Sequence, residues 1–172
     1  MAFIKRAELR LVRFSESQVE HYHRKAASTR EFVFLSHSHH DGDIVSQTVS
    51  LLGEYGVDLY IDWKDHTMPE ITGPNTANRL KKKIQELRKF ILLASNRALA
   101  SHWVPWELGV ADATNGLRNV AIMPVEDVGE AWRGNEYIAI YPRIEKDPKT
   151  AKLFVVFTDG TQAVWLDHWL AS

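Results

Sequence analysis

The sequence predicts an α/β fold, a three-layer sandwich in which helices cover both faces of a central parallel sheet. Two observations predict it. Short runs of consecutive apolar residues, such as Phe32–Leu35, suit strands that are buried on both faces, as parallel strands are. Between these runs lie segments whose apolar residues recur at helical spacing. The resulting order β-α-β-α-β-α-β places helices on both sides of one parallel sheet.

The individual elements follow from local signals. Strands are expected at residues 31–37, 57–61, 90–94 and 120–125. Helices are expected at residues 15–27, from Asp41 or Asp43 to Gly56, from Pro74 onward, and at 101–115. Asp and Ser residues cap helix starts, and Pro suits a first turn. Gly56 suits the left-handed position that ends a helix.

The chain after Glu126 follows a different pattern. Tyr137–Tyr141 is a short strand candidate, and two further strands at 153–157 and 162–166 flank an Asp-Gly turn, a strong hairpin signal. We expect Trp165 and Trp169 to cover an edge of the sheet. The predicted organisation is a basic N-terminal helical extension at 1–30, the main domain at 31–145, and a C-terminal β-hairpin with a short helix at 146–172.

Composition limits the function classes. The 172 residues fit one domain, and the absence of cysteine excludes disulfides and thiolate chemistry. No apolar run approaches the ~20 residues of a membrane span, and the N-terminus lacks a signal-peptide core. A net charge of −1 gives no general attraction to nucleic acid. We therefore expect a cytoplasmic protein with neither membrane nor nucleic acid as a partner.

Three polar segments should meet at the carboxyl ends of the strands, where parallel sheets place their functional groups. They span residues 36–41, 62–73 and 95–101. The first holds three histidines and resembles a metal motif through His37, His39 and Asp41, but Gly42 stands where the last ligand belongs. The alternatives are a polar loop whose aspartates cap the next helix, or an anion site at that helix N-terminus. We expect no metal.

The other two segments suggest a ligand site. Trp103 and Glu107 are four residues apart on one helix face, so an indole plane could lie beside a carboxylate. The alternative is a core Trp and a solvated acid at the first helical turn. Trp63 lies at the root of the long loop after the second strand, where it could face a ligand or the core. The basic residues expected in the next helix suggest a solvated face: Arg79, Lys81, Lys82, Lys83, Arg88 and Lys89.

Together and in order, these segments resemble the TIR (Toll/interleukin-1 receptor) domain. Residues 32–43 resemble its first box, residues 59–69 its second strand and BB loop, and Ser101–Glu107 its Ser-x-Trp-x-x-x-Glu segment. The chain departs from the family where Met68-Pro69-Glu70 replaces a frequent Pro-Gly or Ala-Gly turn. The resemblance implies a flavodoxin-like fold, and the size is similar to stand-alone TIR proteins of bacterial anti-phage systems such as Thoeris.

The resemblance also implies an activity. Many TIR domains cleave NAD at the nicotinamide–ribose bond, which makes Glu107 the expected catalytic residue. The expected NAD contacts are Ser36, His37, Ser38, Trp63 and Trp103. NAD is then a substrate, with no permanently bound cofactor. Expected partners are a second TIR domain, through self-association, and a downstream effector reached by a nucleotide signal. The alternatives are a non-catalytic TIR adaptor and a metal-dependent hydrolase.

Overall fold

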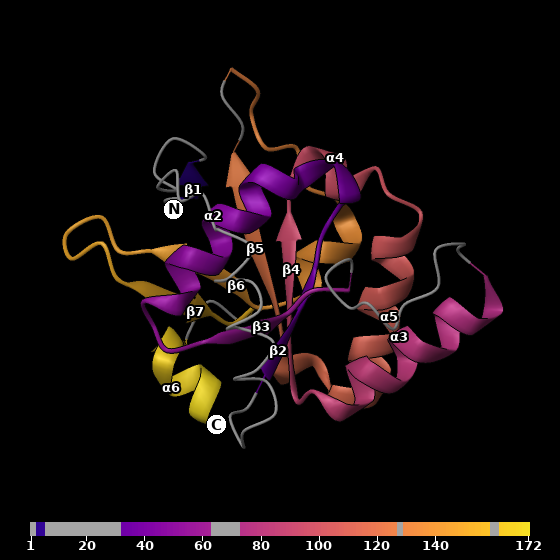
Figure 1. Cartoon of the computed structure of the whole chain (residues 1–172). Coiled ribbons are helices and arrows are strands. Elements are labelled where there is room, and N and C mark those ends of the chain that lie inside the picture. The colour runs from indigo at the N-terminus through magenta and orange to yellow at the C-terminus, as the bar shows by residue number, and fades with distance from the viewer. Residues whose placement is uncertain (1–2, 6–31, 63–72, 127–128, 159–161) are drawn as a thin grey trace.

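The computed structural model describes residues 3–5, 32–62, 73–126, 129–158 and 162–172. These residues build an eight-stranded sheet in the order β3-β2-β4-β5-β6-β7-β8, with β1 paired to β5 (Figure 1). Strands β3 to β6 run parallel, and β7 and β8 are antiparallel. The bounds are β1 Ile4–Lys5, β2 Phe32–Ser36, β3 Asp58–Tyr60, β4 Lys89–Ala94, β5 Val120–Glu126, β6 Arg143–Lys146, β7 Leu153–Val156 and β8 Ala163–Trp165. The predicted parallel α/β sheet is confirmed.

Helices cover both faces of this sheet, as expected. Helices α2 and α6 pack on one face, while α3, α4 and α5 pack on the other (Figure 1). None of the helices in the described ranges is long and apolar enough to cross a membrane. The helix bounds are α2 Gly42–Gly53, α3 Pro74–Glu86, α4 Asn96–Leu99, α5 Trp103–Asn115 and α6 Leu166–Ala171, with 3-10 helices η2 His39–Asp41, η4 Leu117–Asn119 and η5 Glu136–Ile140.

The sheet divides the core into two hydrophobic clusters. Residues of β2 alternate between them, with Val33 and Leu35 facing α2 and Phe34 facing α3 and α5. All six residues of β4 are buried, because this strand lies between β2 and β5 and under helices on both sides. This double burial explains why the strand is a continuous apolar run in the sequence.

One predicted element is wrong. Tyr137–Tyr141 is not a strand: residues 136–140 form η5, with Ile138 buried and Ile140 51% exposed. The place beside β5 is taken by β6, whose pairing begins where the Pro142 carbonyl accepts a hydrogen bond from the Ile122 amide at 2.8 Å. Tyr137, Ile138 and Tyr141 pack instead into the hydrophobic cluster that α3, α4 and α5 form with the sheet.

The N-terminal part contains an element that the sequence analysis did not expect. Ile4 and Lys5 form β1, which pairs in parallel with Val125 and Glu126 at the end of β5. The Ile4 side chain is buried in the cluster under α2. The predicted helix at 15–27 and most of the loop at 62–73 lie outside the described residues.

The C-terminal hairpin is confirmed, since β7 and β8 pair antiparallel and extend the sheet beyond β6. The two tryptophans differ in their burial. Trp169 of α6 is buried against the core, whereas Trp165 is 41% exposed and packs edge-on against Phe154. Only Trp169 therefore covers the sheet in the expected manner.

Candidate functional site

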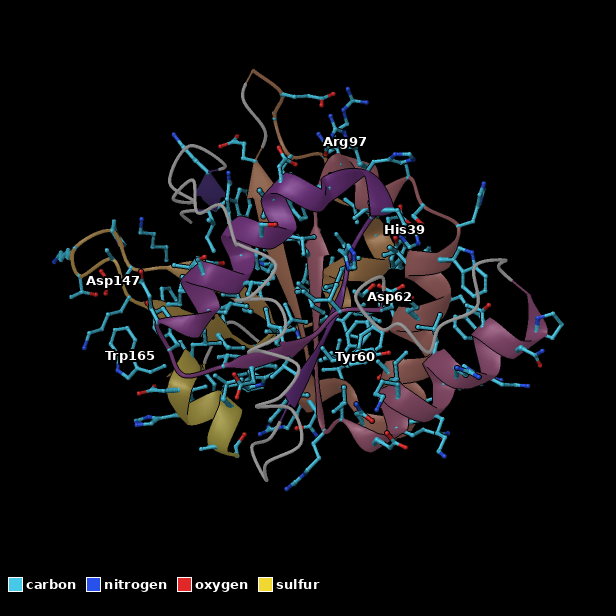
Figure 2. All side chains as sticks on the ribbon, viewed as in Figure 1. His39, Tyr60, Asp62, Arg97, Asp147 and Trp165 are labelled. Atoms are coloured by element: carbon cyan, nitrogen blue, oxygen red, sulfur yellow. The ribbon has the colours of Figure 1, made fainter. Side chains whose placement is uncertain are left out.

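The carboxyl ends of three parallel strands meet at one edge of the sheet. Ser36 ends β2, Asp62 follows β3, and Ser95 follows β4. Side chains from these ends contact one another: the Asp62 carboxylate lies 3.8 Å from the His37 ring, and Ser95 donates a hydrogen bond to Asp41. Asp62 and His39, which come from two of these ends, are labelled in Figure 2. The described residues that begin the three predicted polar segments therefore meet as expected, whereas residues 63–72 of the second segment lie outside the described ranges.

Glu107 points into this convergence. It lies in the second turn of α5 and its side chain accepts a hydrogen bond from the Ser36 hydroxyl, at 2.6 Å between Ser36 Oγ and Glu107 Oε2. The residue is only 5% exposed. Within the described part of the chain, Ser36 is its sole hydrogen-bond partner. The alternative of a solvated acid at the helix start is thus wrong.

The surroundings of Glu107 change its acidity. Burial raises the pKa of Glu107 to about 8, the hydrogen bond from Ser36 opposes the rise, and the charge of Asp62 adds to it. At neutral pH this carboxyl is therefore mainly in its protonated form. A cation that binds beside it would favour the ionised form, because opposite charges stabilise each other strongly where water is excluded.

Trp103 begins the same helix, and its ring is half-buried. The indole packs edge-to-face against Trp106, with the ring centroids 5.2 Å apart, and against the cluster formed by α3, α5 and the sheet. Part of the ring is therefore fixed by packing, and part stays exposed. The Ser101 hydroxyl accepts a hydrogen bond from the Trp103 amide at 3.2 Å, so Ser101 binds the N-terminal end of α5 as predicted. The helix itself starts at Trp103, two residues later than expected.

The histidine segment does not gather its three rings. His37 is buried, with Nδ1 at 3.1 Å from the Leu35 carbonyl, while His39 and His40 are exposed. Burial lowers the pKa of His37 and the nearby Asp62 opposes this, so the ring is neutral at neutral pH. In the ranges the structure describes, no three His, Asp or Glu side chains are placed to hold a metal ion.

Two further polar side chains of this segment, those of Ser38 and Asp41, also make hydrogen bonds. Ser38 Oγ accepts the His40 amide at 3.3 Å and begins η2. Asp41 precedes α2, but its side chain makes no capping hydrogen bond, contrary to the expectation that it caps the helix. Asp41 is fully buried; it accepts the hydrogen bond from Ser95 and lies 3.6 Å from Arg97.

The structure thus adds residues that the sequence analysis did not select. Asp62, Ser95 and Arg97 all contact predicted site segments. The signal that could have identified Asp62 and Ser95 is that each is the first residue of a predicted polar segment at a strand end. The predicted ligand contact Trp63 lies outside the described residues.

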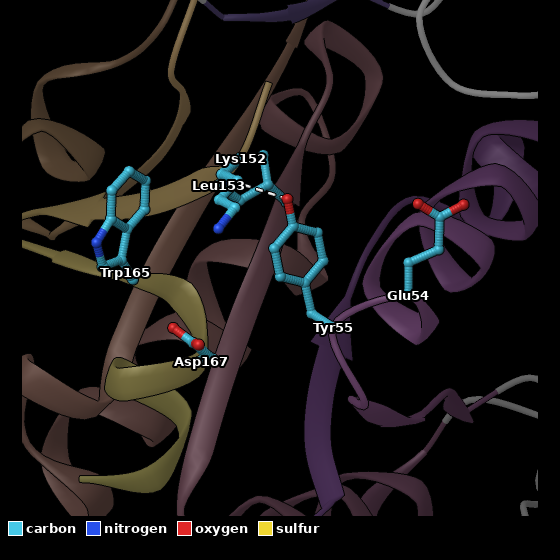
Figure 3. A pocket seen from close by; sticks show the side chains of 6 residues that line it. All are labelled: Glu54, Tyr55, Lys152, Leu153, Trp165 and Asp167. Atoms are coloured by element: carbon cyan, nitrogen blue, oxygen red, sulfur yellow. Dashed lines mark hydrogen bonds between the residues drawn. The ribbon is translucent and has the colours of Figure 1, made fainter. Parts of the chain in front are cut away.

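A separate pocket of about 470 Å³ lies away from this edge, between the end of α2, the start of β7 and the β8–α6 junction. Tyr55 accepts the Leu153 amide at 2.9 Å on one side, and the exposed Trp165 forms the opposite wall (Figure 3). Charged side chains of both signs complete the lining: Glu54, Lys152 and Asp167. Helix α2 starts at the site edge, so this pocket lies at the other end of the helix.

The fold and the site define an α/β domain with a buried carboxylate at the carboxyl edge of its sheet. A family model described as the TIR domain matches residues 33–154, and the chain belongs to this family. The chain is 27% identical over 145 residues to the probable 3′ cyclic ADP-D-ribose synthase ThsB′ of Bacillus cereus, covering 80% of this chain and 74% of the relative. It is 29% identical over 116 residues to the putative cyclic ADP-D-ribose synthase TIR2 of Cytobacillus dafuensis, covering 58% of this chain and 31% of the relative.

Proposed function

We propose that this protein is a TIR enzyme that consumes NAD, cleaves its nicotinamide–ribose bond, and produces an ADP-ribose-derived signal, cyclic or conjugated, in anti-phage defence. The names of both relatives, cyclic ADP-D-ribose synthases, support this class of reaction. The observation that carries the proposal is the placement of Glu107, buried at the carboxyl edge of the sheet and held by Ser36.

The chemistry of the bond explains why one carboxylate suffices. When the bond from nitrogen to ribose C1′ breaks, its electron pair goes to the ring nitrogen, and nicotinamide leaves as a neutral molecule. Positive charge then grows on the ribose, as in glycoside hydrolysis. Glu107, ionised beside the cationic substrate, stabilises this charge, and its effect is larger where water is excluded. A nucleophile then bonds to C1′ and loses its proton: a group of the same molecule gives a cyclic product, and a second small molecule gives a conjugate.

The remaining site residues have roles in substrate binding in this proposal. Ser36 fixes the orientation of the Glu107 carboxylate. The exposed part of the Trp103 ring and the strand-end residues His37, Ser38 and Trp63 contact the nicotinamide and ribose. Self-association, a downstream effector that senses the product, and a cytoplasmic location belong to the proposal as well, on the strength of the TIR resemblance.

The test is mass spectrometry of NAD incubated with purified protein over a range of protein concentrations, since self-association would raise activity. We expect wild-type protein to release nicotinamide and Glu107→Gln to lose at least a hundredfold in rate. Glu145→Gln is the matched control, because Glu145 is equally buried but pairs with Arg143 in β6, and it should keep its activity. Normal turnover by Glu107→Gln would reject the catalytic assignment. No release by wild-type protein at any concentration would leave the adaptor alternative.

A further inference from the structure

The end of β2 holds two carboxylates rather than one. Ser36 donates its hydrogen bond to Glu107, and the next residue, His37, places Nε2 3.8 Å from Asp62 Oδ1. The His37 ring is itself oriented by the Leu35 carbonyl, 3.1 Å from Nδ1. Consecutive residues of one buried strand end thus orient two acids that come from different elements, α5 and the end of β3.

The two acids differ in accessibility. Glu107 is nearly fully buried, whereas the Asp62 side chain is 18% exposed. Asp62 can therefore be reached from solvent while one of its oxygens faces a buried ring. It is also close enough for its charge to raise the pKa of Glu107. A ligand group that touches Asp62 lies in the electric field of both carboxyls.

The described residues supply no basic side chain to this pair of acids. Within the described part of the chain, neither Glu107 nor Asp62 has a Lys or Arg partner. The cation at this edge, Arg97, is held by Asp41 and by the His40 carbonyl, at 3.6 and 3.0 Å. His37 is neutral, since burial lowers its pKa. Without a cation beside it, Glu107 stays mainly protonated at neutral pH, and a cationic ligand would favour its ionised form next to the charge of Asp62.

We propose that Asp62 is a second substrate-binding carboxylate and that, together with Glu107, it makes the site select the cationic, oxidised form of NAD over the neutral ring of NADH. This inference rests on the proposed function and names a binding determinant for the same site. The two dinucleotides share their phosphates, sugars and adenine, so the ring charge is the difference that an acidic pair can sense. The bond-breaking step is unchanged; Asp62 acts on binding of the ring.

Wild-type protein gives the first test, which needs no variant. NADH is added as a competitive inhibitor of nicotinamide release from NAD. We expect its inhibition constant to exceed the KM for NAD by at least about tenfold, the order of magnitude for one partly buried charge contact. Equal affinity for the two dinucleotides would overturn the inference, even if NAD is cleaved normally.

The second test is Asp62→Asn, which removes the charge and keeps the shape. We expect KM for NAD to rise about tenfold with a smaller change in kcat, while the inhibition constant of NADH stays the same. The rising limb of the pH profile of kcat/KM should move to lower pH, because the charge of Asp62 no longer raises the pKa of Glu107. Asp62→Glu should restore the preference for NAD. The control is Asp112→Asn, because Asp112 of α5 binds the Tyr141 hydroxyl outside the site.

The outcomes separate this inference from the proposed function. If wild-type protein releases no nicotinamide, the proposed function fails. If wild-type and Asp62→Asn proteins cleave NAD with the same KM and pH profile, Asp62 only orients His37 and the inference alone fails. If Asp62→Asn does not fold, the NADH comparison with wild-type protein decides.

Discussion

At the scale of single residues, Glu107 combines a functional position with a cost in stability. Its carboxyl is buried, so ionisation inside the folded protein is disfavoured, and the pKa rises from 4.5 to about 8. Between these two values the unfolded chain loses this proton while the folded protein retains it. The unfolded state is thereby favoured as the pH rises. The penalty is absent below about pH 4.5 and complete above about pH 8.

We therefore predict that Glu107→Gln makes the protein more stable at alkaline pH. Near pH 5 the variant and the wild type should have similar free energies of unfolding. At pH 8.5 the variant should be more stable by a few kcal/mol, on the order of 1.4 kcal/mol for each unit of pKa shift. Urea unfolding at pH 5, 6.5 and 8.5 measures the difference.

The control for this experiment is Glu86→Gln, because Glu86 is an exposed acid that pairs with Lys83 on α3. Its effect should be small and almost independent of pH. A stability difference between Glu107→Gln and wild type that does not grow with pH would show that the Glu107 carboxyl is solvated in the folded protein. That result would also weaken the account of its catalytic role.

At the scale of elements, the four parallel strands and the helices between them are predictable because each carries its signal within a dozen residues. A strand buried on both faces, such as β4, must be apolar throughout. Strand β1 has two residues and no such pattern, so its pairing with β5 depends on contacts more than a hundred residues apart in sequence. The tyrosine-rich segment 137–141 has strand-like composition, but packing against the helical face makes it a 3-10 helix.

The site was predictable in location but not in its pairings. Parallel strands place their carboxyl ends together, so the meeting of the three polar segments followed from topology. The individual hydrogen bonds did not follow from topology, because their partners are far apart in the sequence. Ser36 and Glu107 are separated by 71 residues, and Asp41 and Ser95 by 54. Helix-capping preferences offered Asp41 or Asp43 as the cap of α2, yet the Asp41 side chain makes no capping bond and accepts one from Ser95 after β4.

The Ser95 hydroxyl joins two elements, which leads to a prediction at this scale. It donates to the buried Asp41 at the end of η2 and accepts the Ala98 amide at 2.9 Å at the start of α4. Ser95→Ala removes both bonds and leaves a buried carboxylate short of a donor. We expect a loss of about 2–4 kcal/mol in the free energy of unfolding, measured by urea denaturation.

Ser50→Ala is the comparison for this variant, since the Ser50 hydroxyl makes a single long contact of 3.4 Å to its own helix. It should cost much less. If Ser95→Ala were as mild as Ser50→Ala, the link between η2 and the end of β4 would contribute little to the fold, and another contact would have to hold the histidine segment in place.

At the scale of the whole molecule, the C-terminal helix is tied to the opposite edge of the sheet from Glu107. The Trp169 indole donates to the Arg118 carbonyl at 2.8 Å, just before β5. Lys89, at the start of β4, lies 4.7 Å from the centre of the same ring and donates to Asn119 and Ser172. Lys89 is buried, so the prediction that it belongs to a solvated face is wrong. One hydrophobic cluster runs from Ile4 to Trp169, so the described segments should unfold together.

This arrangement predicts that stability and turnover respond separately to a change at Trp169. Trp169→Ala should cost about 3–5 kcal/mol, because it leaves a large cavity and removes the indole hydrogen bond and the Lys89 contact. Trp169→Phe should cost less, since the ring still fills most of the space. Both variants should cleave NAD at the wild-type rate per folded molecule at low temperature, because the parallel strands separate this edge from the carboxyl ends. Thermal unfolding and nicotinamide release measured on the same samples test this. A variant that keeps its Tm would indicate that the C-terminal helix docks independently of the core. A variant that stays folded but loses turnover would mean that the two edges of the sheet are coupled.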